Sequence, residues 1–274
     1  MNYLNQLFSL GDRTAIITGG SGILGSEIAK GLLSAGANVI LLGTHQEKLN
    51  SKVKELSVFG ATVIGLECNV LDKKRIHEVN DIVLEKFGHI DILINAAGGH
   101  VPGAVIGVDQ SIFDLQIEEF EKVTDLNLNG TVLPTLIFGK SIADMKKGSI
   151  INISSMASFR AISRAVGYSA AKAAVDNFTR WMAVEMAQKF GNGIRVNAIA
   201  PGFLLTSQNK QLLTKDDGSL TERGERIISM TPFKRFGEPD ELIGTVLWLA
   251  SDASTFVTGT IIPIDGGFSI YSGV

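Results

Sequence analysis

Residues 14–42, TAIITGGSGILGSEIAKGLLSAGANVILL, contain the pattern that decides the fold. The apolar run at 14–18 predicts a buried strand, the glycines after it predict a tight turn, and residues 23–35 repeat apolar side chains at helical spacing. A second apolar run at 38–42 predicts the next strand. A strand, a helix and a strand in this order form a βαβ unit, whose two strands lie parallel.

The same alternation continues along the chain. Further strands are expected at 61–67, 90–95, 149–154, 193–200 and 260–265, and further helices at 46–58, 72–87, 168–190 and 239–251. Apolar strands separated by helices are typical of a parallel sheet covered on both faces. We therefore predict an α/β fold, a single doubly wound Rossmann-type domain over residues 1–274 with a seven-stranded parallel sheet. Residues 203–232 are polar and long for a connection, so we expect a lid, with a surface insertion as the alternative.

The composition argues against several classes of protein. The chain has 274 residues, 45% of them hydrophobic, so it can bury a large core without metal or disulfide. Its net charge of −3 argues against nucleic-acid binding, and its apolar runs are too short to span a membrane. The single cysteine, Cys68, cannot form an intrachain disulfide and fits a cytoplasmic location. Residues 1–10 lack the features of a secretory signal, and we expect a small molecule as substrate and no metal.

The turn TGGSGILG, residues 18–25, joins the first expected strand to the first expected helix. Glycines let the backbone approach a pyrophosphate, and the first N–H groups of a helix face its negative charge. The turn therefore predicts a dinucleotide site, with a plain strand-to-helix turn as the alternative. The expected contacts are Gly19, Ser21, Ile23 and Leu24.

The end of the second strand bears on which nucleotide binds. An acidic residue here would accept a hydrogen bond from the ribose 2′-OH and repel a 2′-phosphate, but the sequence continues with Gly43, Thr44 and His45. Thr44 and His45 are candidate contacts for a 2′-phosphate, which favours NADP. Since no arginine is present either, NAD stays open as the alternative.

Tyr168 and Lys172 stand four residues apart in GYSAAKAA, so a helix places both on one face. A lysine cation near a phenol favours the phenolate, which lowers the tyrosine pKa from its usual value of ~10. A tyrosine tuned in this way can exchange a proton with a substrate oxygen near neutral pH. Ser155 ends the fifth expected strand, where open α/β sheets bind ligands, and Ser154 is the alternative at this position.

Together these motifs resemble those of the short-chain dehydrogenase/reductase family, over nearly the whole chain. Besides Ser155, Tyr168 and Lys172, the similar motifs are TGGSGILG (18–25), NAAG (95–98), DLNLNG (125–130), PG (201–202) and VTGTIIPIDGG (257–267). The resemblance implies an enzyme that interconverts ketones and secondary alcohols, in which NAD or NADP carries the hydride and the protein supplies geometry and electrostatics.

The resemblance also implies a role for each catalytic position. Tyr168 would act as the general acid in reduction and as the base in oxidation. Lys172 would tune Tyr168 and bind the nicotinamide ribose, while Ser155 would donate a hydrogen bond to the substrate carbonyl oxygen. Asn127 would hold a water that connects Lys172 to solvent, with Asn129 as the alternative.

Further cofactor contacts follow from the same resemblance. Asn69 would meet the adenine and Thr206 the nicotinamide amide. The other expected contacts are Val70, Asn95, Ala96, Ala97, Pro201 and Gly202. Three positions depart from the family's pattern: Ile23 stands where a glycine is usual, Ala96 where asparagine is common, and Asn69 where aspartate is common.

Four polar residues are candidates for binding the substrate. Arg160 and Arg164 precede Tyr168 in a loop that would pass the mouth of the site. A guanidinium matches the two oxygens of a carboxylate, so either arginine implies an acidic substrate if it points inward, and a solvated surface otherwise. In the expected lid, Gln208 and Asn209 would suit hydroxyl groups.

A carboxylate together with several hydroxyls suggests a sugar acid. Four stretches also resemble a subgroup of D-mannonate oxidoreductases, the fructuronate reductases: AAGGHVPGA (96–104), the region 155–179, APGFLLTSQN (200–209) and the tail DGGFSIYSGV (265–274). The resemblance implies reversible reduction of D-fructuronate to D-mannonate. Another ketone, such as a ketogluconate or a 3-oxoacyl thioester, is the first alternative, and a non-catalytic dinucleotide-sensing scaffold is the second. His100 is a further candidate for the substrate wall, with a solvated loop histidine as the alternative.

The expected helix at 168–190 carries apolar side chains on more than one face. Ala171, Val175, Phe178 and Met182 lie on one face, and Ala173, Trp181 and Val184 on another. A helix that is apolar nearly all round is buried on both sides. The family resemblance implies a homotetramer with this helix at a two-fold interface, and burial within the monomer is the alternative.

Overall fold

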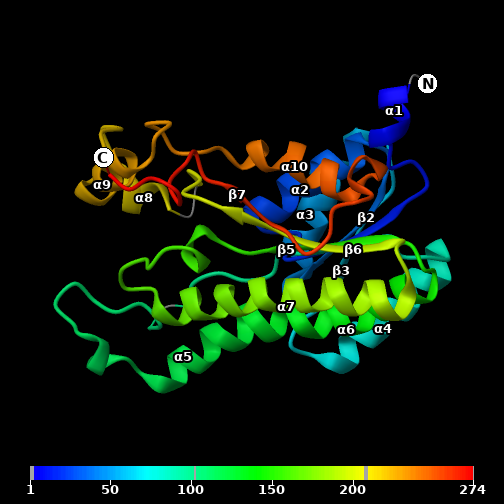
Figure 1. Ribbon diagram of the computed structural model, residues 1–274, viewed down its shortest axis with the longest axis horizontal. Helices are drawn as coiled ribbons and strands as arrows, with labels where there is room; N and C mark the ends of the chain where they lie inside the picture. Colours follow the sequence, from blue (N-terminus) through cyan, green and yellow to red (C-terminus); the bar gives the residue numbers. More distant parts are fainter. Residues whose placement is uncertain (1–2, 102, 207–208, 274) are drawn as a thin grey trace.

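The computed structural model describes residues 3–101, 103–206 and 209–273. Within them, a parallel sheet of seven strands runs in the order β3-β2-β1-β4-β5-β6-β7 (Figure 1). The strands are β1 (Thr14–Thr18), β2 (Asn38–Gly43), β3 (Val63–Glu67), β4 (Ile92–Asn95), β5 (Gly148–Ile153), β6 (Ile194–Pro201) and β7 (Ile261–Ile264). The predicted α/β fold with a doubly wound, seven-stranded parallel sheet is confirmed.

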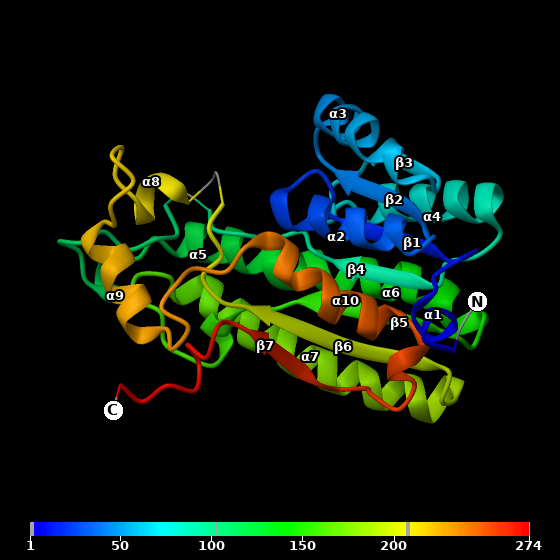
Figure 2. The same cartoon turned by 90° about the horizontal axis from the view of Figure 1, so that it is seen from above.

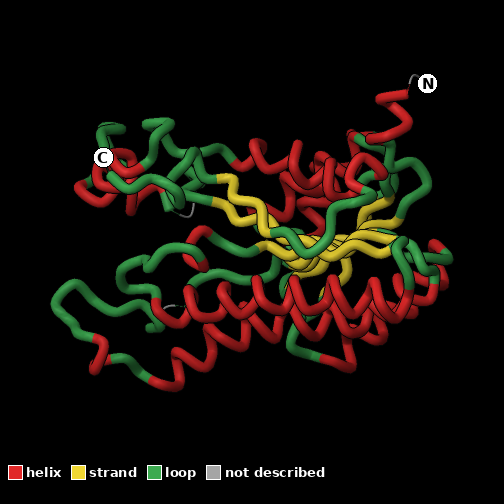
Figure 3. The backbone as a smooth tube through the Cα atoms, viewed as in Figure 1, coloured by secondary structure: helices red, strands yellow, loops and turns green. Residues whose placement is uncertain are grey.

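Helices cover both faces of this sheet, which forms the middle layer (Figures 1 and 3). One face carries α2 (Ile23–Ser34), α3 (Gln46–Leu56) and α10 (Ile243–Ala250), and the other carries α4 (Lys73–Phe87), α6 (Gly130–Asp144) and α7 (Val166–Phe190). Shorter helices are α1 (Tyr3–Phe8), α5 (Ile117–Thr124), α8 (Lys210–Leu213) and α9 (Glu222–Met230). None of the described helices is long and apolar enough to cross a membrane.

Alternation along each strand divides the interior into two cores. Ile17 and Ile94 pack with the α2, α3 and α10 layer, whereas Ile16 and Leu93 pack with the α4, α6 and α7 layer. All four side chains are fully buried. The strands therefore read as continuous apolar runs, since both of their faces are covered.

The stretch between β4 and β5 departs most from the sequence expectation. The sequence pattern predicts no helix there, yet the structure contains α5, a π-helical turn at Asp125–Asn129 and α6. The helix α6 was not predicted because it contains Gly130, Pro134 and Gly139, and glycine and proline normally interrupt helices. Here the small Gly139 lets the helix approach β5 closely, so packing outweighs intrinsic propensity.

Two other expected helices are shorter than predicted. The helix expected at 46–58 ends as α3 at Leu56 and continues as a 3₁₀ turn at Ser57–Phe59. The helix expected at 239–251 begins as a 3₁₀ turn at Pro239–Leu242, before α10. The other 3₁₀ turns are Ile112–Asp114, Met156–Ser158 and Asp252–Ser254.

The segment 203–232 contains α8 and α9, which lie together beyond the carboxyl end of β6 (Figure 2). It has a small apolar cluster of its own, formed by Leu213 and Ile227 with Phe236. Phe203 and Phe268 pack against this cluster, with their rings edge to face at 5.2 Å. Although its sequence is polar, this segment therefore contains two helices and a small apolar cluster.

Candidate active site

The site is built at the carboxyl ends of β1 and β4, where the strand order reverses. The register pairs Thr18 with Asn95, so the two strand ends lie side by side. Thr18 Oγ1 accepts hydrogen bonds from the backbone N–H groups of Ala96, at 3.1 Å, and Ala97, at 3.0 Å. Crevices at such reversal points are where open α/β sheets bind their ligands.

The turn after β1 needs glycine at two positions. Gly19 has φ +65°, and a Cβ there would lie 2.9 Å from the Ala96 carbonyl oxygen. A Cβ on Gly25 would lie 2.4 Å from the Gly19 carbonyl oxygen. The turn is therefore pressed against both α2 and the end of β4, which leaves its backbone close to any ligand in the crevice.

The amino-terminal end of α2 is open to an anion. Its N-cap residue, Gly22, has no side chain to accept from the first N–H groups of the helix. The N–H groups of Ile23 and Leu24 therefore have no side-chain cap and present partial positive charge to the crevice. This glycine cradle beside an uncapped helix end fits the pyrophosphate of a nicotinamide dinucleotide.

The other expected nucleotide contacts lie around this cradle. Ser21 reaches toward the end of β2, because its Oγ lies 2.9 Å from the position of a Cβ on Gly43. Thr44 and His45 are exposed directly after β2. Asn69 is exposed and Val70 is buried, and Asn69 Oδ1 accepts from the Leu71 N–H at 3.0 Å.

Asn95 points its side chain away from the crevice and into the core. Its Nδ2 donates to Thr135 Oγ1 and to Asn152 Oδ1, both at 2.8 Å. Asn152 Nδ2 in turn donates to Thr179 Oγ1 at 2.9 Å. This buried polar chain ties β4 and β5 to α6 and α7, so only the backbone of Asn95 remains on the crevice side.

Ser155 and Tyr168 are brought together, although 13 residues separate them in sequence. The two side chains are hydrogen-bonded, and Ser155 Oγ also accepts from the Ala157 N–H at 3.2 Å. Ser154 turns elsewhere, donating its hydroxyl to the buried carboxylate of Asp176. Of the two adjacent serines, the structure thus places Ser155 beside the tyrosine.

Tyr168 and Lys172 lie on the same face of α7, but their pKa values differ from the expectation. Burial raises the pKa of Tyr168, opposed by its bond to Ser155, so the predicted lowering is wrong for this structure. Burial lowers the pKa of Lys172 to about 8, opposed by Asp176. Lys172 Nζ donates to the Ile153 carbonyl at 2.7 Å and lies 5.6 Å from the Tyr168 ring centre. Burial of the phenol therefore sets the direction of the Tyr168 shift.

Asn127 lies in the π-helical turn and is fully buried. Its side chain clamps Gly99, accepting from that N–H at 2.9 Å and donating to that carbonyl at 2.8 Å. A Cβ on Gly98 would lie 2.6 Å from Asn127 Oδ1 and 3.4 Å from Lys172 Nζ, so all three residues meet. Asn129 is exposed and bonds to Asp125, which leaves Asn127 as the asparagine at the site.

His100 lies against Tyr168, with their ring centres 4.5 Å apart. Burial lowers the pKa of His100, and the positive charges of Arg223 and Lys172 lower it further, so the ring is neutral at neutral pH. Arg223 belongs to α9 and is exposed. Across the described part of the chain it has neither an ion pair nor a hydrogen-bond partner. Sequence reasoning missed Arg223, because nothing in the sequence indicates that α9 brings a positive charge within electrostatic range of His100.

The arginines expected at the substrate site are engaged elsewhere. Arg160 donates from Nε to the Ser269 carbonyl at 2.7 Å and from Nη2 to the Tyr271 carbonyl at 2.8 Å. Arg164 donates from Nε to the Ile106 carbonyl at 2.5 Å. Both guanidinium groups therefore tie loop backbones together.

Asn209, one of the lid residues expected to meet the ligand, lies in a turn. Asn209 accepts from the Thr206 N–H at 2.8 Å and donates to the Leu204 carbonyl at 2.8 Å. This turn follows Pro201 and Gly202 at the end of β6, and Gly202 donates its N–H to the Ile264 carbonyl at 2.9 Å. Gln208 lies outside the described residues.

Known proteins resemble this chain over almost all of its length. Residues 20–269 match a family model described as enoyl-(acyl carrier protein) reductase. An uncharacterised oxidoreductase of Bacillus subtilis, UxuB, is 44% identical over 275 residues, which cover 97% of this chain and 98% of that protein. The 2-dehydro-3-deoxy-D-gluconate 5-dehydrogenase of Bacillus subtilis is 35% identical over 98% of this chain and 99% of that enzyme.

A solved structure is similar as well. It is the crystal structure of a Haemophilus influenzae protein assigned as a D-mannonate oxidoreductase, with bound NAD. It superposes with a TM-score of 0.91 at 41% identity and covers 99% of this chain and 100% of that one.

Proposed function

The chain belongs to the short-chain dehydrogenase/reductase family and is an NAD(P)-dependent oxidoreductase, and from that premise we propose that it interconverts D-fructuronate and D-mannonate. The observation that carries the proposal is Arg223, which acts electrostatically on His100 and has no ion pair or hydrogen bond among the described residues. A guanidinium within electrostatic range of His100, which itself lies against the catalytic tyrosine, suits a substrate that carries a carboxylate. The similar 2-dehydro-3-deoxy-D-gluconate 5-dehydrogenase and the Haemophilus protein, both named for sugar acids, support the same substrate class.

Proton transfer in the proposed reaction falls to Tyr168. Its raised pKa keeps the hydroxyl protonated at neutral pH, ready to donate to the ketone oxygen during reduction. Ser155 donates to the same oxygen as negative charge develops on it. Lys172, when protonated, stabilises the phenolate that remains. The bound dinucleotide supplies the hydride.

Arg223 takes the role for which the sequence suggested Arg160 and Arg164. Those two donate to backbone carbonyls, whereas the Arg223 guanidinium has no hydrogen-bond partner within the described ranges of the chain. The neutral His100 can exchange hydrogen bonds with a hydroxyl of the sugar. We propose that α8 and α9 act as a lid that brings Arg223 onto the substrate carboxylate.

The substrate assignment is tested by following the absorbance of the reduced nicotinamide. The purified protein is mixed with NADH or NADPH and with D-fructuronate, 5-ketogluconate, an acetoacetyl thioester or a neutral ketose. We expect the fastest oxidation with D-fructuronate and its loss in Tyr168→Phe, which removes the transferable proton. Turnover of the thioester alone would replace the sugar-acid proposal with an acyl substrate.

The role of Arg223 is tested by Arg223→Met. Because a hydrogen bond to a charged group contributes about 1.5–3 kcal/mol, we expect KM for D-fructuronate to rise about 10- to 100-fold. The neutral ketose should keep its KM. Arg226→Met is the matched control, since Arg226 lies on the same helix but pairs with Glu222. Equal changes in both variants would rule Arg223 out as the carboxylate partner.

We also propose NADP as the preferred nucleotide. The residues after β2, Thr44 and His45, are exposed and carry no negative charge that would repel a 2′-phosphate. The Haemophilus protein holds NAD, so the assay must compare both nucleotides. A higher kcat/KM with NADH than with NADPH would overturn this preference.

A further inference from the structure

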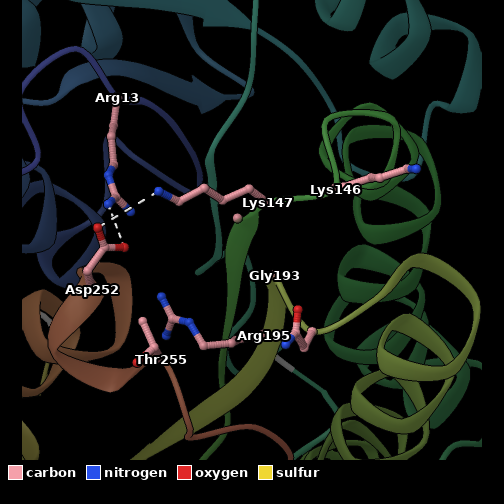
Figure 4. Close-up of a pocket in the computed structure, with 9 residues that line it drawn as sticks. Arg13, Lys146, Lys147, Gly193, Arg195, Asp252 and Thr255 are labelled. Atoms are coloured by element: carbon pink, nitrogen blue, oxygen red, sulfur yellow. Dashed lines mark ion pairs between the residues drawn. The ribbon is translucent and has the colours of Figure 1, made fainter.

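A cavity of about 170 Å³ lies at the amino-terminal edge of the sheet, opposite the active site (Figure 4). Gly148, the first residue of β5, lines it, together with Arg195 near the start of β6. Lys172 bonds to Ile153 at the other end of β5. Five residue steps of about 3.3 Å separate these ends, so the cavity lies about 17 Å from the catalytic lysine's carbonyl partner.

Positive charge dominates this cavity. Arg13, Lys147 and Arg195 line it together with a single carboxylate, that of Asp252. Arg13 Nη2 lies 2.8 Å from an Asp252 oxygen, and Lys147 Nζ lies 3.8 Å from the other. Lys146 also lines the cavity but directs its ammonium group away from the others (Figure 4). Three cations facing one carboxylate leave two positive charges uncompensated.

Arg195 is the buried member of this group, with 5% of its surface exposed. Its guanidinium donates to the Leu249 carbonyl at 2.5 Å, to Ser254 Oγ at 2.6 Å and to the Ser251 carbonyl at 3.0 Å. All three acceptors are neutral. Carbonyls at the end of α10 supply only partial negative charge, and a buried cation without a full counter-charge is costly. Burial and repulsion from Arg13, opposed by the Asp252 carboxylate, lower the pKa of Arg195 to about 10.

The cavity combines this charge with access from solvent. Lys147 and Thr255 are exposed at its rim, while Gly148 and Arg195 are buried at its base. The volume is large enough for an ion the size of phosphate. Lys147, Arg195 and the Thr255 hydroxyl supply donors for oxyanion oxygens.

We propose that this cavity is a binding site for a small, doubly charged oxyanion, with inorganic phosphate as the representative ligand. The proposal is independent of the substrate assignment, because the site lies at the opposite end of the strands. Two positive charges favour a dianion over chloride or a monocarboxylate. The site binds more weakly as salt is added, because its rim is exposed.

Isothermal titration with inorganic phosphate tests the proposal, with saturating NAD present so that the pyrophosphate cradle is occupied. We expect saturable binding at one site per chain. Since an exposed charge pair contributes up to about 1 kcal/mol, Lys147→Gln should weaken binding about two- to fivefold. Asp252→Asn should strengthen binding by a similar factor, because it removes the carboxylate that competes for the same cations.

Lys52→Gln is the matched control. Lys52 is also a surface lysine paired with one carboxylate, Glu55, at 2.7 Å, but it lies on α3. Its replacement should leave phosphate binding unchanged. No saturable binding to the NAD-loaded protein, or an equal loss in the Lys147 and Lys52 variants, would overturn the proposal. Opposite shifts in Lys147→Gln and Asp252→Asn would establish that the ion lies in this cavity.

Discussion

At the scale of single residues, burial shifts the pKa values of two neighbouring side chains in opposite directions. Burial raises the pKa of Tyr168 and lowers the pKa of Lys172 to about 8, because each environment disfavours the charged form. Asp176 partly restores the lysine charge. At neutral pH the pair therefore consists of a neutral acid next to a cation, which is the arrangement that reduction of a ketone requires.

This pairing predicts the pH dependence of the reaction. Lys172 is charged below its pKa of about 8 and stabilises the phenolate that forms during reduction, so kcat for reduction should fall as pH rises through about 8. Asp176→Asn removes the charge that raises the Lys172 pKa, so its fall should occur at lower pH. Rates measured from pH 6 to pH 10 on both proteins provide the check. An identical profile in the variant would mean that another group controls the rate.

Sequence spacing alone predicted much of this residue-scale arrangement. The interval of four residues placed Tyr168 and Lys172 on one face, and the strand end placed Ser155 nearby. Spacing could not show that Asn95 turns inward, because that depends on partners from α6 and α7. Nor could it find Arg223, because its charge reaches His100 from a helix far away in the sequence.

At the scale of elements, glycines act in two different ways. Gly25 lies in α2 where the turn after β1 presses against the helix, so no side chain fits. Gly244 lies in α10, where a Cβ would meet nothing within 4 Å. Glycine is thus required at position 25, whereas at position 244 it only lowers the stability of the helix. Sequence periodicity predicted both helices but missed α6, whose glycines and proline are accommodated by close packing.

This contrast predicts opposite effects of one substitution. Gly25→Ala forces the turn apart and should reduce dinucleotide affinity at least about tenfold, with a loss of about 1–3 kcal/mol in the free energy of unfolding. Gly244→Ala should leave affinity unchanged and add about 0.5–1 kcal/mol of stability, because alanine favours the helix. Dinucleotide titration and urea unfolding of both variants give the two quantities. A wild-type affinity in Gly25→Ala would show that the turn does not form the cradle.

At the scale of the whole molecule, α7 is buried on one side only. Val175 and Met182 are buried, whereas Trp181 is 61% exposed and Val184 is 56% exposed. Leu136 on the neighbouring α6 is also 56% exposed. Burial within the monomer therefore does not account for every apolar face, and we propose that these residues form an interface in a homotetramer.

Trp181→Glu tests that assembly. A charge placed in an apolar interface must be desolvated, so the variant should elute as a smaller species than the wild-type protein. Light scattering after size-exclusion chromatography gives the mass of each. Val58→Glu serves as the control, because Val58 is 77% exposed on a 3₁₀ turn and should not change the mass. A wild-type protein that is already monomeric would refute the proposed tetramer.

The lid unit with its own apolar cluster has a consequence for the order in which ligands arrive. The dinucleotide cradle is made by the turn after β1, α2 and the end of β4, none of which belongs to this unit. Arg223, in contrast, is carried on α9. If the proposed lid opens and closes, NAD(P) can bind while it is open, and the proposed sugar acid is retained only after it closes. The nucleotide should therefore bind before the substrate and leave after the product. The turnover rate should fall in viscous solvents, because opening of the lid then limits the rate.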